Sequence, residues 1–358
     1  MAKIPSSAIG IDIGRYTMKA VALTRRGNGR LVLTHFATRE LGAEPRTVDA
    51  VAANLKALLG QLGGKGKVCA IAVSPGDSFL RIIEQPDMPA QSLRDSLRYT
   101  SQTLLNQDCR DFVLDCDRIG SVVQPEGGEN GSAVVAPAQP LARYLVGGVP
   151  RLYVRMLFEA CKRAKIPPTS LQLAPVATLN AFEHAHEATF SRQAFVLANM
   201  GHGSSTVIVG VKGELVVFRV LEYGGRQFVE EMAGQATPGP GLEAIVQKLQ
   251  EDDPALWEAA RLSLTELIRS ISSSIGFVEA RHEELIPRIY LEGGLARIPQ
   301  VPSLLTEELQ LPCETWSPFA KCDIEVPKDR LALLTAEMPM LAAAFGAAAA
   351  LLQPPKKR

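Results

Sequence analysis

Two stretches of the sequence decide the fold: "AIGIDIGRYT" from Ala8 to Thr17 and "VLANMGHGSS" from Val196 to Ser205. Each is an apolar run that reaches a carboxylate or its amide, Asp12 or Asn199, and then a glycine-rich turn. Because the same device occurs twice, the sequence predicts an internally duplicated protein whose two glycine loops face a shared cleft. Only the first copy carries a charge at the equivalent position.

The regions around both stretches repeat one order of elements: a strand, the glycine loop, a second strand, a tight turn and a third strand. The strands expected in the two copies are Ala8–Ile13, Met18–Thr24 and Leu31–Thr38, then Phe195–Asn199, Thr206–Val211 and Leu215–Leu221. Apolar residues with a 3.6 period predict helices at 48–62, 151–165 and 264–278. A further strand, Ile289–Glu292, is expected to run into Gly293 and Gly294, with a helix near Pro299.

Between the two copies lies a block, about residues 66–142, that looks like a small α+β insertion. We expect "VCAIAVSP" to be a buried strand with "FLRIIEQP" as its neighbour, followed by a helix at "AQSLRDSLRYTSQTLL" and strands at "DFVLDCDRIG" and "GSAVVAPAQ". The predicted domains are a first lobe of residues 1–65, 143–190 and 338–352, the insertion, and a second lobe of residues 191–337.

The composition argues against several classes of function. Lysine and arginine total 38, as do aspartate and glutamate, so no general positive field favours nucleic acid. The six cysteines lack metal-site spacing, and His184 and His186 lie too close in sequence to share a helix face. The Ala-rich run Met340–Leu352 falls short of the roughly 20 residues that span a bilayer and suits a helix packed inside the protein. We therefore expect a cytosolic protein that reaches a membrane through a partner.

An aspartate at the end of a strand, followed by glycine, suits phosphate chemistry. Asp12 can hold a magnesium ion through water, and the backbone around Gly14 can offer N–H groups to phosphate oxygens. Lys19 would add a positive charge on the same hairpin, and Gly293 and Gly294 would let a flat ring or a ribose lie against the backbone. Each motif alone is also typical of an ordinary turn. In register, the two loops would bracket a nucleotide from both sides.

The order of these motifs resembles that of the PilM-type pilus assembly proteins, members of the actin-like ATPase superfamily related to the cell-division protein FtsA. The resemblance runs from Ile9 to about Leu352. It is carried by "IGIDIGRYTMKAVAL", "AVSPGDSFLRIIEQPDMPAQSLRDSLR", "ACKRAKIPPTSLQLAPVATLNAF", Gly224-Gly225, "LTELIRSISSSIGF" and "YLEGGLARIPQV". It implies an α/β, duplicated actin-like (ribonuclease H-like) two-lobe fold. The insertion resembles the subdomain that separates this branch from actin and the sugar kinases.

The resemblance also implies ATP and magnesium between the lobes. The positions that match the family's nucleotide motifs are Asp12, Gly14 and Lys19 in the first loop, Gly201, Ser204 and Ser205 in the second, Gly293 and Gly294 beside the adenosine, and Lys248 beside the ribose. Arg15 and Asn199 occupy positions of the same two loops, and the resemblance places them beside the nucleotide as well. The implied role is a cytoplasmic scaffold of a type IV pilus or related secretion machine, peripheral to the inner membrane. It would bind the N-terminal cytoplasmic tail of a PilN-like inner-membrane protein as an extended peptide between the first lobe and the insertion. Actin-like folds also form filaments, which leaves a homo-oligomer open.

Two departures from the family pattern bear on activity. Arg15 and Tyr16 replace small hydroxyl residues, and an arginine there either pairs with phosphate or occupies its place. Asn199 stands where the family has aspartate, and an amide is a far weaker base and brings no charge to a magnesium shell. The sequence therefore predicts at most a slow ATPase. The alternative is an active ATPase or an actin-fold sugar or small-molecule kinase, which would need a base near the γ-phosphate.

Overall fold

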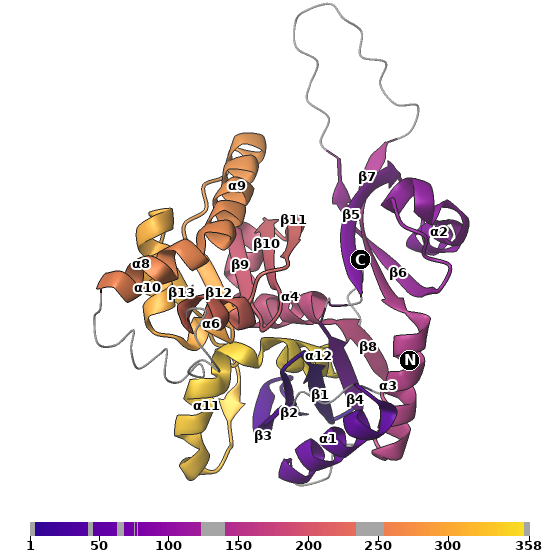
Figure 1. Cartoon of the computed structure of the whole chain (residues 1–358). Coiled ribbons are helices and arrows are strands. Elements are labelled where there is room, and N and C mark those ends of the chain that lie inside the picture. The colour runs from indigo at the N-terminus through magenta and orange to yellow at the C-terminus, as the bar shows by residue number, and fades with distance from the viewer. Residues whose placement is uncertain are drawn as a thin grey trace, which may run out of the picture. The chain divides into compact units, whose positions relative to one another are not determined.

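Two sheets are seen in the computed structural model (Figure 1), which describes residues 4–41, 46–62, 68–74, 76, 78–122, 140–233 and 254–353. The five strands of one sheet correspond in order to five strands of the other, which has one more strand at an edge. The chain divides into two compact units, one of Met1–Gly76 and Leu157–Arg358 and the other of Asp77–Met156. Both central sheets lie in the first unit. The first sheet has the order β14-β3-β2-β1-β4-β8 and the second the order β11-β10-β9-β12-β13.

The element bounds follow the chain. The strands are β1 (Ser7–Ile13), β2 (Thr17–Arg25), β3 (Leu31–Glu40), β4 (Cys69–Val73), β5 (Phe79–Pro86), β6 (Phe112–Ser121), β7 (Leu141–Pro150), β8 (Ser170–Leu173), β9 (Ala194–Met200), β10 (Ser205–Val211), β11 (Glu214–Leu221), β12 (Ile289–Gly293), β13 (Cys313–Thr315) and β14 (Asp323–Ile324). The α-helices are α1 (Val48–Gln61), α2 (Ala90–Leu105), α3 (Arg151–Arg163), α4 (Ala174–Ala185), α5 (Glu187–Arg192), α6 (Gly225–Ala233), α8 (Pro254–Ser263), α9 (Thr265–His282), α10 (Gln300–Leu309), α11 (Leu331–Glu337) and α12 (Ala342–Leu352). Short 3-10 turns are η1 (Leu295–Arg297), η2 (Lys328–Arg330) and η3 (Met338–Met340).

The two sheets confirm the predicted duplication. In each, a central strand pairs antiparallel with the strand that follows its glycine loop and parallel with a strand much later in the chain, β1 with β2 and β4, and β9 with β10 and β12. The loops close in the same way. The Gly14 N–H donates to the Thr17 carbonyl and the Gly201 N–H donates to the Ser204 carbonyl, both over 3.1 Å. The strands and helices expected around both loops are all present, with ends that differ by a few residues.

One predicted strand pairing is wrong. The strand at "VCAIAVSP", β4, pairs in parallel with β1 and β8 in the first sheet, whereas "FLRIIEQP", β5, pairs with β7. β4 is apolar along its whole length and buried on both faces, which suits the centre of a parallel arrangement covered by helices. The strand expected at "GSAVVAPAQ" lies almost entirely outside the described residues. The domain boundaries given from the sequence stay a prediction.

Helices α4 and α12 lie between the two central sheets (Figure 1). Small residues let α12 approach both α4 and β1 closely, since a side chain at Gly346 would lie 1.7 Å from the Ala177 carbonyl oxygen of α4, and one at Gly10 of β1 would lie 1.9 Å from the Ala344 carbonyl oxygen. On the far side of α4, Phe182 packs against Phe195 of the second sheet with ring centroids 4.8 Å apart. The prediction that the Ala-rich C-terminal run is a packed core helix is therefore confirmed.

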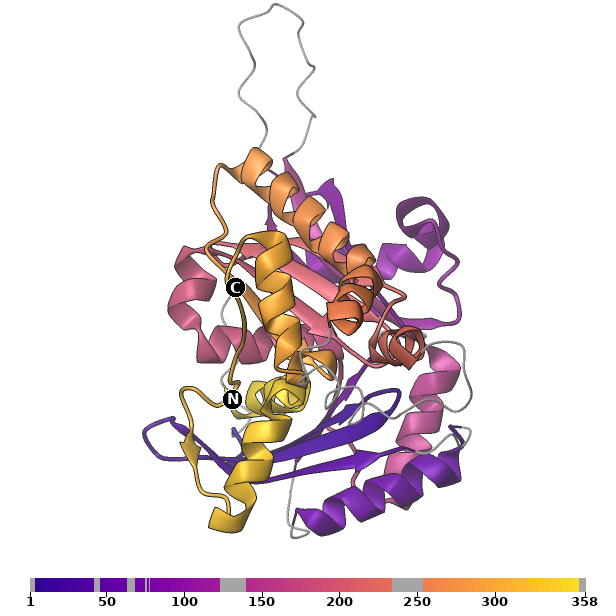
Figure 2. The same ribbon diagram turned by 60° about the vertical axis from the view of Figure 1, so that its left-hand side comes forward.

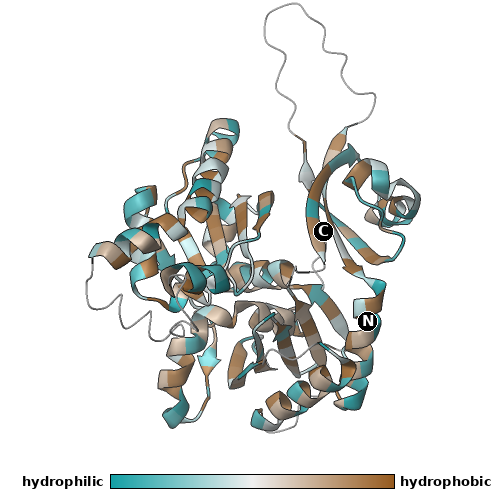
Figure 3. Ribbon diagram, in the orientation of Figure 1, coloured by the Kyte–Doolittle hydropathy of each residue, from teal (hydrophilic) through white to brown (hydrophobic). Residues whose placement is uncertain are grey.

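Helix α9 covers the other face of the second sheet, over β10 and β11 (Figure 2). Its buried residues are Leu267, Ile271, Ser274, Ile275 and Val278, which recur at helical spacing. The central strands are mostly hydrophobic and the outer helices carry the polar residues (Figure 3). Burial of apolar surface on both faces of each sheet is thus the main force that fixes the strands next to the glycine loops.

The second unit has its own three-stranded sheet, in the order β5-β7-β6, and the helix α2. Its core holds Leu93 and Leu97 of α2 against Tyr144 and Val146 of β7, all fully or nearly fully buried. The Tyr144 hydroxyl donates to the Met88 carbonyl over 2.6 Å and accepts from the Met88 N–H over 2.7 Å. β5 and β6 are the edge strands of this sheet.

Within the described residues, no single helix is both long and apolar enough to cross a membrane. The segments Lys328–Met340 and Ala342–Leu352 pass that test only as a pair, and they are bent by 90° at their junction.

Candidate functional site

The candidate site is built where β1 and β9 end and the two glycine loops begin. The register pairs Asp12 with Lys19 across β1 and β2, and the Lys19 Nζ lies 2.9 Å from the Asp12 Oδ2. At the equivalent place in the second sheet, Asn199 pairs with Thr206. The first copy therefore holds an ion pair between the buried Asp12 and the half-buried Lys19, and the second copy holds two neutral side chains.

The acid of the second copy stands on the next strand. Asn199 is aligned with Glu292 of β12, and its Nδ2 donates to the Glu292 Oε1 over 2.5 Å. Glu292 is 1% exposed. In the first sheet the residue that aligns with Asp12 on the equivalent strand is Ala72. The two halves thus carry their acids on different strands.

Burial raises the pKa of Glu292 to about 7, because the ionised carboxylate loses its solvation inside the protein. The Asn199 hydrogen bond and the nearby Thr178 hydroxyl lower this pKa, the Asp12 charge raises it and the Lys19 charge lowers it. The sequence analysis missed Glu292 as a site residue. The available signal was an acid inside an otherwise apolar strand, directly before Gly293-Gly294.

Side chains of the first loop reach the second loop. The Tyr16 and His202 rings are stacked, with centroids 4.6 Å apart and planes inclined by 17°. The Arg15 side chain runs between two glycines, since a methyl group at Gly76 would lie 2.6 Å from the Arg15 Nη2 and one at Gly203 would lie 3.2 Å from its Nη1. We call these contacts the Arg15–Tyr16 clasp.

Charges of both signs surround the clasp, since the Tyr16 hydroxyl donates to the Glu40 Oε2 over 3.3 Å and the Glu230 charge raises the pKa of His202. The Arg46 guanidinium donates to the Gly14 carbonyl over 2.8 Å. Burial lowers the pKa of His202, and the charges of Arg226 and Arg15 lower it further. His202 is therefore neutral at pH 7, which suits its stacking on Tyr16 beside a cation.

The structure places most of the predicted phosphate residues around this point but gives several of them internal partners. The Ser205 hydroxyl is buried and donates to the Tyr223 carbonyl over 2.8 Å. Gly201 is required by its turn, because a side chain there would lie 2.8 Å from the Ser204 carbonyl oxygen. Gly293 has a positive φ of 97° and lies against Met200. Gly294 faces open space, and Lys248 lies outside the described residues.

The residues present fit magnesium and nucleotide in part. The Asp12 Oδ1 is buried and has no hydrogen-bond partner in the described part of the chain, which suits an acceptor for a metal-bound water. Its other oxygen is occupied by Lys19. Among the described residues, no group of three or more acidic, histidine or cysteine side chains is placed to hold a metal directly. The clasp fills space beside both loops.

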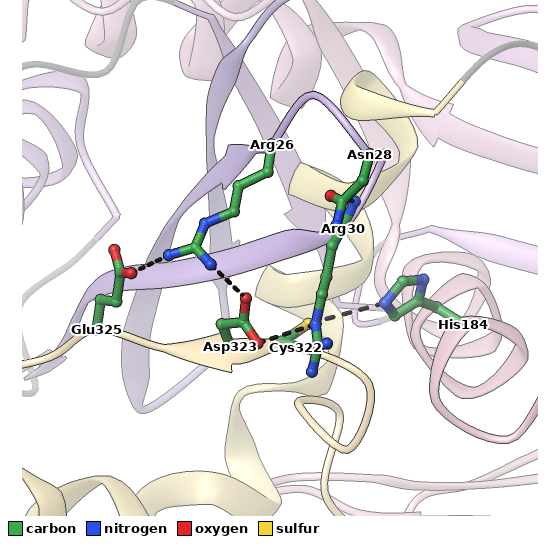
Figure 4. Close-up of polar contacts among 7 residues, drawn as sticks. All are labelled: Arg26, Asn28, Arg30, His184, Cys322, Asp323 and Glu325. Carbon is green, nitrogen blue, oxygen red and sulfur yellow. Dashed lines mark hydrogen bonds and ion pairs between the residues drawn. The ribbon is translucent and has the colours of Figure 1, made fainter.

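A second polar cluster offers a cysteine and a histidine, the pair that an enzyme needs for nucleophilic catalysis (Figure 4). The Cys322 Sγ lies 3.7 Å from the His184 Nε2. Burial raises the pKa of Cys322 to about 12 and lowers that of His184, so the thiol stays protonated and unreactive.

The neighbouring charges in this cluster are structural. Arg26 and Arg30 bind Asp323 at 2.8 and 2.9 Å, and Arg26 also pairs with Glu325 (Figure 4). They fasten the short edge strand β14 to the turn between β2 and β3.

Comparison with known proteins agrees with this architecture. Residues 154–350, more than half of the chain, match the model of the family described as type IV pilus assembly protein PilM. The chain belongs to this family. The predicted PilM-type membership is thereby confirmed. No curated protein sequence matches the chain significantly.

Solved structures support the fold over nearly the whole chain. A structure of the PilM-PilN type IV pilus biogenesis complex is similar with a TM-score of 0.78 and 23% identity, over 98% of this chain and 100% of that one. The ethanolamine utilization protein EutJ from Carboxydothermus hydrogenoformans is similar with a TM-score of 0.52 and 13% identity, over 97% and 90% of the two chains. The predicted duplicated actin-like fold of this PilM-family chain is confirmed.

Proposed function

We propose that this PilM-family chain is a cytoplasmic scaffold for assembly of a type IV pilus or related secretion machine, held at the inner membrane by a PilN-like partner. The observation that carries the proposal is the family match together with a likeness to the PilM-PilN complex that spans the whole chain. In the described part of the second unit, β5 and β6 stand at the two edges of the sheet, each paired with β7 on one side. An extended tail peptide can add to such an edge by main-chain hydrogen bonds.

The scaffold role is tested by calorimetric titration of the full chain with a synthetic peptide. The peptide has the sequence of the N-terminal cytoplasmic tail of the PilN-like partner. We expect saturable binding with one peptide per chain. A scrambled peptide of the same composition is the control and should not bind. Equal heats for both peptides, or none for either, would contradict the proposal.

We also propose that the cleft binds ATP and magnesium weakly and hydrolyses ATP slowly at most. The support is the Arg15–Tyr16 clasp and the neutral Asn199 at the end of β9. ATP would lie beside the loop residues Asp12, Gly14, Lys19, Gly201 and Ser204, with Gly294 next to the adenosine. Rapid turnover of ATP by the purified chain, or rapid phosphorylation of a sugar, would overturn this proposal.

A further inference from the structure

We propose that Asn199 and Glu292 act as one unit, in which the acid of the second half of the cleft stands on β12 and not, as in the first half, at the end of the central strand. The chain then tolerates an acid at either position but not at both. The inference itself rests on contacts and register. Only its consequence for ATP rests on the nucleotide cleft proposed above.

The first step is the contact between the two side chains. Asn199 meets Glu292 through an N–H that donates to a carboxyl oxygen over 2.5 Å. An aspartate at position 199 has no N–H to give, so two carboxylates would face one another in its place. Like charges in contact disfavour ionisation of both, and one of them must be protonated or the strands must part.

The second step is the supply of positive charge. The Lys19 charge acts on Glu292, but the Lys19 Nζ is already 2.9 Å from the Asp12 Oδ2. Asp12 adds a further negative charge on the same side. A second acid, at the half-buried position 199, would therefore face the buried Glu292 without a cation of its own, which is costly.

The third step is the comparison of the two halves. In the first, the acid Asp12 has the cationic donor Lys19 across the hairpin, and Ala72 stands at the position of Glu292. In the second, the acid Glu292 has the amide donor Asn199, and Thr206 stands at the position of Lys19. Each half thus keeps one acid and one N–H donor, on different strands.

The consequence concerns access to the cleft. Glu292 is 1% exposed and its Oε1 accepts from Asn199, so solvent water does not reach it as a base. Moving the acid back to position 199, with an amide at 292, would restore a carboxylate at the strand end that precedes the second loop. The pair therefore decides whether the cleft has a base.

The test is a double-mutant cycle of Asn199→Asp, Glu292→Gln and the two together, measured by urea unfolding of the full chain at pH 8. We expect Asn199→Asp to lower the folding equilibrium constant, and the double variant to recover about tenfold or more of that loss. Asn199→Leu is the matched control, because it removes the hydrogen bond without adding charge. Asn199→Asp should lower the folding equilibrium constant more than Asn199→Leu does.

Additive effects of the two substitutions on stability would contradict the proposed coupling of Asn199 and Glu292. Equal decreases in the folding equilibrium constant for Asn199→Asp and Asn199→Leu would contradict it too. If Asn199→Asp does not fold, the double variant still decides, because it must fold about as well as Glu292→Gln. ATP hydrolysis by the folded variants is the separate readout for the cleft. If the effects of the two substitutions on stability are coupled but no variant binds ATP, the coupling of Asn199 and Glu292 is supported and the proposed nucleotide cleft is contradicted.

Discussion

At the scale of single residues, the cleft of this PilM-family chain is defined by how its acids and cations are paired. Asp12 and Lys19 form a part-buried ion pair, and the Asn199 amide donates a hydrogen bond to Glu292. Sequence reasoning found Asp12, Lys19 and Asn199 because each stands at a recognisable strand end. Glu292 could not be found in this way, because its hydrogen-bond partner Asn199 lies 93 residues away in the sequence.

The buried Glu292 predicts how stability changes with pH. Folding raises its pKa from 4.5 to about 7, so between these values the folded chain holds a proton that the unfolded chain has lost. This stabilising contribution is complete below about pH 4.5 and disappears as the pH rises through 7. We expect the unfolding free energy, relative to Glu292→Gln, to fall by about 2 kcal/mol between pH 5.5 and 8.

Urea unfolding of both proteins at several pH values measures this difference. The groups that act on Glu292, namely Asp12, Lys19, Asn199 and Thr178, are unchanged in the variant. The exposed acid Glu222 gives a matched control, since the plot of unfolding free energy against pH for Glu222→Gln should run parallel to that of the native protein. A Glu292→Gln curve that also ran parallel would show that Glu292 titrates normally in the folded state.

The Arg15–Tyr16 clasp predicts a gain of nucleotide affinity on its removal. Arg15 lies against Gly76 and Gly203 and Tyr16 stacks on His202, so these side chains contact both loops beside which we propose that phosphate binds. We expect the double variant Arg15→Ser/Tyr16→Ser to bind ATP about tenfold more tightly, equal to about 1.4 kcal/mol. Titration calorimetry measures this. The control Tyr99→Ser, at an exposed tyrosine of the second unit, should leave the ATP affinity unchanged. Weaker ATP binding by the double variant would show that Arg15 is itself a phosphate ligand.

At the scale of elements, periodicity predicted the strands and helices well but not their partners. β4 is a short apolar run, and such a run indicates a buried strand without saying which strand lies beside it. Its neighbour in space is β1, reached through the crossover helix α1, whereas its neighbour in sequence is β5. The Tyr16–His202 stack escaped prediction for the same reason, because it depends on how the two loops meet.

The close approach of α12 and α4 predicts a large cost for one added methyl group. Gly346→Ala would place its Cβ 1.7 Å from the Ala177 carbonyl oxygen, which forces the helices apart. We expect a loss of about 1–3 kcal/mol in unfolding free energy. Gly276→Ala is the matched control, because that position in α9 faces open space and alanine favours the helix, so it should stabilise by about 0.5–1 kcal/mol. Equal effects in chemical denaturation would contradict the packing argument.

At the scale of the whole molecule, the chain combines two related sheets in one unit with a second unit that has its own core. The duplicated glycine motif predicted the first feature, since both sheets place it at the same strand end. The extent of the second unit was harder to predict. Its compact part spans Asp77–Met156 and leaves β4 with the first unit, because β4 pairs with β1 and no local sequence pattern specifies that long-range pairing.

Separate cores predict that the second unit can be loosened alone. Tyr144→Ala removes a fully buried ring and its two hydrogen bonds to Met88, which should cost that unit about 3 kcal/mol or more. Amide hydrogen exchange should then rise in β5, β6 and β7 and stay slow in β9 and β10, while affinity for the PilN-like tail peptide falls. Tyr99→Ala, which removes an exposed ring from the same unit, should change neither. Exchange that rose equally in both units would show that they unfold as one, and a tail that bound undiminished to the loosened chain would place its site outside the second unit.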